Sequence, residues 1–91
     1  MVTAQDIGFI RETFQLSQRD LARALNVGGY TVARWEDGTN SPAGLPAEVL
    51  RALHETAVRV SSDQDEAKAR HVGGLIALGI GALIFYLLTR E

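Results

Sequence analysis

The pattern of residues 17–38 constrains the fold most, because it places two short helix-forming segments on either side of one tight turn. Ser17 and Asp20 have the spacing of a capping box, with Asp in place of the usual Glu or Gln. Residues 26–29 (Asn-Val-Gly-Gly) interrupt the first segment, and two consecutive glycines permit a sharp change of direction. The second segment stops at Gly38, which suits a left-handed C-terminal cap. This pattern predicts two consecutive helices joined by a short turn.

The segments on either side of this pair also have helical periodicity. Ile7, Ile10 and Phe14 recur at the spacing of one helix face, and the hydroxyl of Thr3 can cap that helix. A fourth helix is expected to begin between the prolines at positions 42 and 46. Its apolar side is formed by Val49, Leu50, Leu53 and Ala57. Since no stretch before residue 72 alternates like a β-strand, the sequence predicts an all-α domain of four to five helices, followed by an apolar C-terminal helix.

Composition divides the chain into three zones. Residues 1–60 have the mixed composition of a small folded domain, and 91 residues leave room for one such domain and one appendage. Residues 61–71 are polar and run from acidic to basic, as suits a helix dipole, so they are predicted to be a linker that can be helical. Residues 72–89 are apolar and are predicted to be a transmembrane or oligomerisation helix.

The apolar zone contains no charged residue and would span about 27 Å as a helix, close to the lower limit for crossing a bilayer. Lys68 and Arg70 precede it, and such cationic flanks favour a cytoplasmic domain anchored at the inner membrane. The alternative is a soluble helix buried in a dimer or in the groove of a partner. Small residues recur at every fourth position and are candidates for a face on which two helices pair: Gly73, Ala77 and Gly81.

Residue types give little support to catalysis or metal binding. The chain has no cysteine, which removes disulfides, thiolate metal sites and cysteine nucleophiles. His54 and His71 each stand without a second ligand or base at a suitable spacing. We therefore expect no metal, no cofactor and no catalytic residue, and predict that the chain is not an enzyme.

Residues 16–38 resemble a known family of DNA-binding proteins. They read Leu16-Ser17-Gln18-x-x-Leu21-Ala22-x-x-Leu25-x-Val27-x-x-x-Thr31-Val32-x-Arg34-Trp35-Glu36-x-Gly38. This pattern is similar to that of the phage repressor and Cro-like (XRE) family, and the resemblance extends to the helix before it and to residues 42–53 after it. It implies a lambda-repressor-like helix-turn-helix domain, in which one helix braces on the DNA backbone while the next lies in the major groove.

The resemblance also implies which residues contact DNA. Gln18 occupies a position that typically contacts phosphate and supports the recognition helix, and Arg19 beside it is a candidate for a backbone contact. Family members touch bases or the adjoining backbone from the start and exposed side of the next helix, which here carries Gly29, Tyr30, Thr31, Ala33 and Arg34. The chain departs from the family at residues 28 and 29, where glycines replace a capping and a base-reading side chain.

The chemistry of these side chains suits the implied roles. Arg34 can present a bidentate fork to a guanine edge or clamp a phosphate, and Tyr30 can donate to phosphate or touch a thymine methyl. The alternative for Arg34 is a solvated ion pair with Glu36 or Asp37. Trp35 lies on the inward stripe of its helix and is predicted to belong to the core.

The formal net charge of −2 is low for a DNA-binding chain, because much of the affinity for DNA comes from Lys and Arg that replace counterions on phosphates. A dimer with two recognition helices would compensate for weak binding by each monomer. The leading hypothesis is a sequence-specific transcriptional regulator, a dimeric repressor that binds a double-stranded operator and is tethered by its tail to a membrane. Two alternatives stay open: a membrane-anchored adaptor whose helix-turn-helix domain binds a protein, and an antitoxin-type autoregulator.

Overall fold

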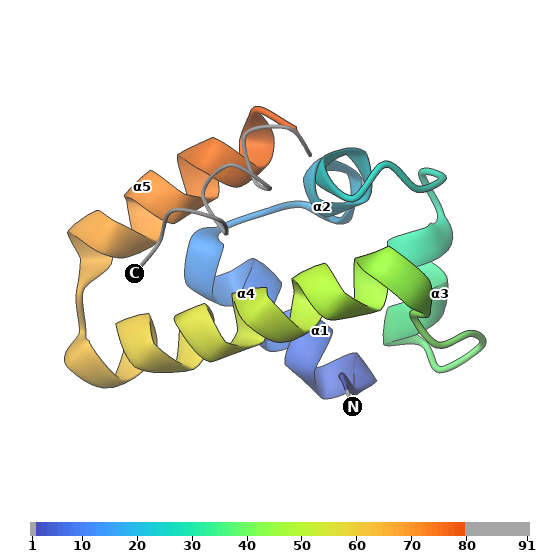
Figure 1. Ribbon diagram of the computed structural model, residues 1–91, viewed down its shortest axis with the longest axis horizontal. Coiled ribbons are helices and arrows are strands. Elements are labelled where there is room, and N and C mark those ends of the chain that lie inside the picture. The colour runs from blue at the N-terminus through green and yellow to red at the C-terminus, as the bar shows by residue number, and fades with distance from the viewer. Residues whose placement is uncertain (1, 80–91) are drawn as a thin grey trace.

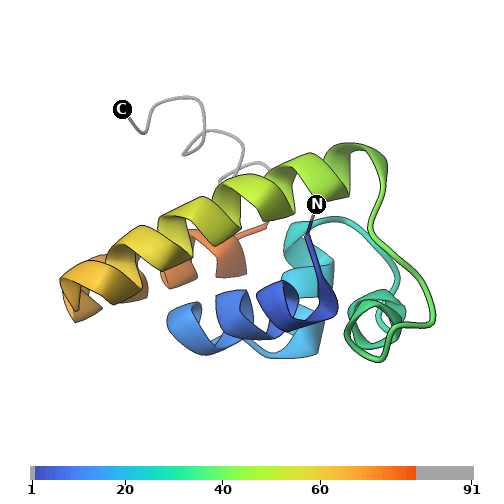
Figure 2. The same cartoon turned by 90° about the horizontal axis from the view of Figure 1, so that it is seen from below.

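The computed structural model describes residues 2–79, which form five helices and, within that range, no β-strand. The helices follow in chain order as α1 (Ala4–Phe14), α2 (Gln18–Ala24), α3 (Thr31–Glu36), α4 (Gly44–Asp63) and α5 (Glu66–Ala77). Figures 1 and 2 show α4 lying along α1, α3 at one end of the molecule, and α5 folded back against α1, α2 and α4. The prediction of an all-α fold is confirmed.

Two side-chain caps set the starts of α1 and α2. The Thr3 hydroxyl accepts a hydrogen bond from the Asp6 backbone N–H at 3.1 Å, and the Asp6 carboxylate accepts one from the Thr3 N–H at 2.9 Å. Ser17 and Asp20 form the same reciprocal pair at 3.0 and 3.3 Å. The bond from the Thr3 backbone is the main cause of a lowered pKa at Asp6. Aspartate thus completes both capping boxes in place of the longer Glu, as the sequence predicted for α2.

All five helices contribute to one hydrophobic core. The predicted stripe of α1 is buried, and the predicted apolar side of α4, which begins at Gly44 between the two prolines, packs against it. The core side chains of these two helices are Ile7, Ile10, Phe14, Val49, Leu50, Leu53 and Ala57. The core therefore forms where the helical periodicity of the sequence places it.

The polar zone of residues 61–71 is mostly helical, as the sequence allowed, and its helices pack within the domain. α4 continues to Asp63, and only Gln64 and Asp65 separate it from α5, so most of residues 61–71 belong to two helices of the domain. Gln64 adopts a left-handed conformation (φ 52°) that reverses the chain. Val72 and Ile76, one helical turn apart on α5, are both 0% exposed and join the core. The apolar zone therefore begins inside the domain, because its first residues complete the core.

Gly73 allows α5 to lie directly on the end of α1. A Cβ atom built at this position would lie 2.6 Å from the carbonyl oxygen of Phe14, so only glycine fits. The prediction that Gly73 pairs with a second copy of the chain is therefore not met in this structure, since the residue is already buried against α1. Ala77 is exposed, and Gly81 lies outside the described residues.

Within residues 2–79, no helix is both long enough and apolar enough to cross a membrane. α5 ends at Ala77, and the remainder of the predicted apolar helix, residues 80–89, lies outside the described part of the chain.

Candidate nucleic-acid interface

The inner face of α3 is anchored in the core. Val32 is fully buried and Trp35 is 6% exposed, which confirms the prediction that the single tryptophan of the chain is a core residue. Both side chains project from the same side of this six-residue helix toward α1 and α2. Because α3 is too short to be stable alone, its position depends on these contacts.

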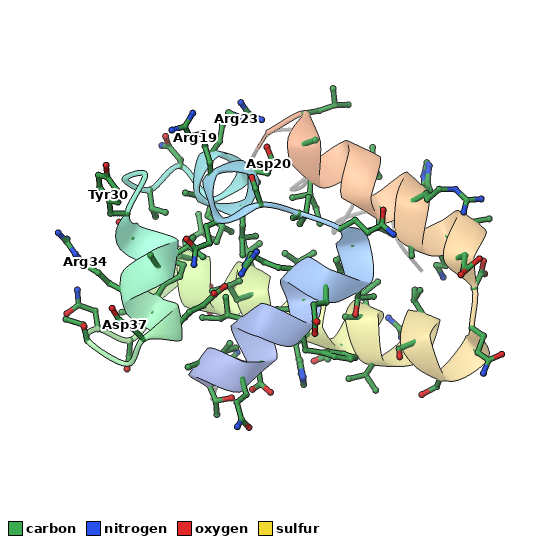
Figure 3. The ribbon with its side chains drawn as sticks, turned by 180° about the vertical axis from the view of Figure 1, so that it is seen from behind. Arg19, Asp20, Arg23, Tyr30, Arg34 and Asp37 are labelled. Carbon is green, nitrogen blue, oxygen red and sulfur yellow. The ribbon has the colours of Figure 1, made fainter. Side chains whose placement is uncertain are left out.

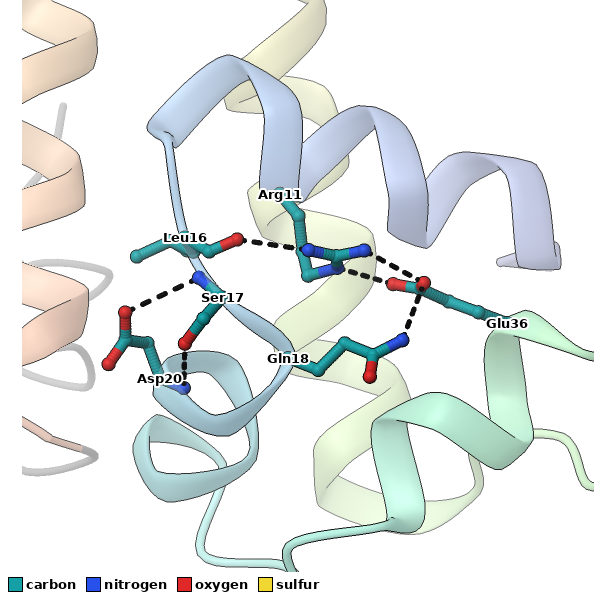
Figure 4. A network of polar contacts seen from close by, with 6 residues as sticks. All are labelled: Arg11, Leu16, Ser17, Gln18, Asp20 and Glu36. Carbon is teal, nitrogen blue, oxygen red and sulfur yellow. Dashed lines mark hydrogen bonds and ion pairs between the residues drawn. The ribbon is translucent and has the colours of Figure 1, made fainter.

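A polar network fixes the C-terminal end of α3 (Figure 4). The Glu36 carboxylate accepts hydrogen bonds from Nε and Nη2 of Arg11 on α1, at 2.5 and 2.9 Å, and from Nε2 of Gln18 on α2, at 3.0 Å. Arg11 also donates from Nη1 to the carbonyl oxygen of Leu16, at 3.1 Å. The Glu36 carboxylate therefore joins three helices. The guanidinium of Arg11 also provides a hydrogen-bond donor for the Leu16 carbonyl, in the connection between α1 and α2.

The electrostatics of this network favour the charged form of both partners. The hydrogen bonds from Arg11 lower the pKa of Glu36, with a smaller contribution from Gln18, and the Glu36 carboxylate raises the pKa of Arg11. Sequence reasoning missed Arg11 and considered Glu36 as a solvated partner of Arg34, because Arg11 and Glu36 are 25 positions apart and no local spacing relates them. For Gln18, the structure shows the supporting contact to α3; the implied contact to phosphate stays a prediction.

The turn between α2 and α3 does not depend on its glycines in the way the sequence predicted. Asn26 takes the left-handed conformation (φ 57°), whereas neither Gly28 nor Gly29 has a positive φ. The backbone N–H of Thr31 donates to the carbonyl oxygen of Gly28 at 3.0 Å, which starts α3, and the N-cap residue Tyr30 supplies no side-chain bond. The change of direction is made at Asn26 because asparagine tolerates this conformation better than most residues. The predicted left-handed residue after α3, at position 38, is confirmed (φ 84°).

The outer side of this helix pair carries the side chains predicted to meet DNA. Tyr30 is 80% exposed, and Figure 3 shows it beside Arg34 on α3 and on the same side of the molecule as Arg19 on α2. Gly29, Arg19 and Arg34 are exposed, while Thr31 and Ala33 are half-buried. The structure therefore brings Arg19, Tyr30 and Arg34 to one edge of the molecule, whereas Gln18 points inward to Glu36.

Some arginines along this edge form an ion pair within the domain and others do not. Arg23 is paired with Asp20 at 3.0 Å, one helical turn earlier on α2. Among residues 2–79, neither Arg19 nor Arg34 lies within ion-pair distance of a carboxylate, so the structure does not show the ion pair considered for Arg34. The carboxylate of Asp37 instead accepts a hydrogen bond from the Thr39 backbone at 2.8 Å, and bonding from Thr39 lowers the pKa of Asp37.

A cavity between α1 and α5 lies away from this edge. It has a volume of about 430 Å³ and lies between the end of α1 and the start of α5, beside Glu12, Glu66 and Arg70. α3 contributes no residue to it. In residues 2–79, no group of three His, Asp or Glu side chains is arranged to hold a metal ion. The exposed residues of the α2–α3 edge therefore lie apart from this cavity.

Comparisons with known proteins identify one relevant similarity. No family model and no solved structure matches the chain. An adenine DNA glycosylase of Mycolicibacterium smegmatis is 35% identical over 82 residues, a match that covers 76% of this chain and 28% of the glycosylase. The chain thus spans little more than a quarter of the length of this relative.

This similarity overturns the prediction that the chain is not an enzyme, because the relative is an enzyme. That prediction relied on the lack of a recognisable catalytic constellation in 91 residues. Such reasoning fails for a sequence that matches only part of a larger catalytic protein, because the residues that carry out the chemistry can lie outside the matching part.

Proposed function

We propose that the chain binds double-stranded DNA with the edge formed by α2 and α3, as a helix-turn-helix domain of the phage repressor and Cro-like type. The observation that carries this proposal is the division of α3 into two sides. Its inner side and C-terminal end are fixed by Val32, Trp35 and Glu36, whereas its outer side presents Tyr30 and Arg34 to solvent. A rigidly seated helix with an exposed polar face is what reading a major groove requires.

The side chains on the edge fit the two kinds of contact that DNA offers. The guanidinium of Arg34 matches the O6 and N7 acceptors of guanine, and the exposed ring of Tyr30 can contact a thymine methyl or donate to phosphate. Arg19, the second residue of the supporting helix, is placed for the phosphate backbone. In this arrangement Gln18 acts chiefly by holding Glu36, and thereby the end of α3.

The biological role we favour is a dimeric transcriptional repressor that blocks a promoter by occupying an operator. The net charge of −2 argues for a dimer, because one copy offers few free arginines to phosphate. Two copies would place their recognition helices one helical turn apart on a palindrome. Since Gly73 is buried against α1, the pairing surface in this proposal excludes that residue.

A second candidate is the DNA-binding part of an enzyme that acts on DNA, and the similarity to an adenine DNA glycosylase favours it. Enzymes that act on a base in duplex DNA also need a surface that holds the backbone while the base is exposed. The α2–α3 edge would serve such an enzyme for positioning. Tighter binding of the chain to a duplex with one mismatched adenine than to the fully paired duplex, measured by fluorescence anisotropy, would support this candidate over the repressor.

The test of the proposal is a selection of random duplex DNA on the full chain at low salt. We expect enrichment of a short motif, repeated as a palindrome if the chain dimerises. On the selected duplex, Arg34→Ala should weaken binding by roughly 1 to 3 kcal/mol, whereas the control Arg59→Ala, an exposed arginine on α4, should bind like the wild type. No enrichment, or equal losses in the two variants, would refute the proposed interface and favour a protein-binding adaptor.

A further inference from the structure

We propose that α5 has two mutually exclusive positions: docked on the domain, as in the structure, or withdrawn into a lipid bilayer together with the apolar residues that follow it. The stretch without charge starts at Val72 and continues to Thr89. Its first two large side chains on the inward face of α5, Val72 and Ile76, are both 0% exposed in the core. The same side chains can therefore fill the core or face lipid, but they cannot do both at once.

The length of the apolar stretch makes the two positions exclusive. Residues 78–89 would span about 18 Å even as one continuous helix, whereas the hydrocarbon core of a bilayer is about 30 Å thick. Starting from Val72 extends the span to about 27 Å, and Arg70 and Arg90 mark its charged limits. A segment that crosses the bilayer must therefore remove Val72 and Ile76 from the domain.

The docked position depends on one close backbone contact. A Cβ at Gly73 would lie 2.6 Å from the Phe14 carbonyl oxygen, and backbone atoms cannot move aside as a flexible side chain can. The next residue, Gly74, is exposed, and a Cβ there would meet nothing within 4 Å. The two glycines therefore form a matched pair, because an added methyl group opposes docking at one position and is tolerated at the other.

The exposed end of α5 gives lipid a first point of contact. Leu78 is 76% exposed and Ala77 beside it is also exposed, so the docked helix presents an apolar end where the remaining apolar residues begin. Once α5 leaves, the surfaces of α1, α2 and α4 that it covers become accessible to water. Lipid binding is therefore coupled to a loss of stability in the rest of the domain, independently of whether the domain binds DNA.

The first experiment compares the full-length wild type with Gly73→Ala and Gly74→Ala in the presence of phosphatidylcholine vesicles, which carry no net charge. Flotation measures the bound fraction, and amide hydrogen exchange measures the protection of α5 and of the end of α1. We expect Gly73→Ala to bind vesicles roughly tenfold more strongly than Gly74→Ala, since overpacking penalises only the docked position. Vesicle-bound protein should lose protection in the part of α1 that α5 covers.

A second pair of variants keeps the test decisive if Gly73→Ala does not fold. Leu78→Lys places a charge near the middle of the apolar stretch but on the surface of the docked domain. It should unfold at the wild-type temperature, yet bind vesicles roughly a hundredfold more weakly. Leu45 is also exposed but lies on α4, outside the apolar stretch. The control Leu45→Lys should therefore bind vesicles like the wild type.

Three results would overturn the inference. Equal vesicle binding by the two alanine variants, with unchanged protection of α5 on the vesicle, would show that the helix stays docked. Wild-type binding by Leu78→Lys would show that the apolar stretch does not insert. Loss of α5 protection that depends on protein concentration and needs no vesicles would assign the released helix to a second copy of the chain.

Discussion

Replacing Glu36 by glutamine tests how much the negative charge contributes to the network that joins α3 to α1 and α2. Glutamine keeps the size of the side chain and one acceptor oxygen, but it turns an NH₂ group toward donors. The guanidinium of Arg11 then loses its anionic partner. If the remaining oxygen keeps the bonds from Nη2 of Arg11 and Nε2 of Gln18, Nε of Arg11 faces the new NH₂ group and loses its acceptor. The expected result is a less stable domain in which the C-terminal end of α3 is released first.

The exposure of the two partners sets the expected magnitude. The side chains of Arg11 and Glu36 are 26% and 18% exposed, so the pair is neither a free surface ion pair nor a fully buried one. Hydrogen bonds to charged groups contribute about 1.5 to 3 kcal/mol each. After allowance for partial solvation and for the bond that glutamine retains, we expect a loss of about 2 kcal/mol in the free energy of unfolding. For a domain of this size, that loss lowers the Tm by roughly 8 to 16 °C.

The pH dependence of the loss provides an independent check. The native structure lowers the pKa of Glu36 below 4.5, so its contribution to stability is complete above that value. The contribution disappears as the pH falls through the lowered native pKa, because the carboxyl becomes protonated in the folded state as well. The difference in Tm between the wild type and Glu36→Gln should therefore be largest at neutral pH and shrink progressively below pH 4.5.

Thermal unfolding followed by circular dichroism measures this difference across the pH range. Glu55→Gln is the matched control, since it removes the same charge from an exposed position on α4. Its Tm should stay within about 2 °C of the wild type. The reasoning is refuted if Glu36→Gln unfolds at the same temperature as this control at neutral pH, or if their difference does not depend on pH.

Three further substitutions test the remaining parts of the structure. Ser17→Ala removes the cap of α2 and should destabilise the domain by about 1 kcal/mol in urea unfolding, whereas an unchanged midpoint would show that the cap is dispensable. Trp35→Ala leaves a cavity beneath α3 and should cost about 3 to 5 kcal/mol; a loss below about 1 kcal/mol would contradict its placement in the core. Tyr30→Ala should leave the Tm unchanged, because the side chain is 80% exposed, but should weaken binding to a selected duplex in a fluorescence anisotropy titration; equal affinity would remove Tyr30 from the interface.

Local signals in the sequence were sufficient for the helices that precede α5. The hydroxyls of Thr3 and Ser17 mark helix starts, and Gly38 follows a helix end, because caps involve residues within four positions of one another. The inward position of Trp35 follows from helical periodicity, which also acts over a few residues.

Features that depend on distant residues could not be predicted in this way. The network around Glu36 joins residues 18 and 25 positions apart, and each of its members alone resembles an ordinary surface residue. The start of the apolar zone could not be assigned to the domain for a related reason. Val72 and Ile76 suit lipid and a protein core equally well, and only the folded domain shows that a core position is open to them. Gly73 resembled a helix-pairing residue, because nothing local indicates the Phe14 carbonyl beneath it.

The turn before α3 has a consequence for binding. Asn26 makes the reversal, so Gly28 and Gly29 occupy conformations that residues with a side chain can also adopt, and Gly29 has open space around it. Their presence leaves the peptide that leads into α3 with more conformational entropy than alanine would allow. A ligand that immobilises this peptide must offset the lost entropy, which lowers the affinity of every complex. In return, this peptide can adapt to partners of slightly different shape, while α3 itself stays fixed by Val32, Trp35 and Glu36.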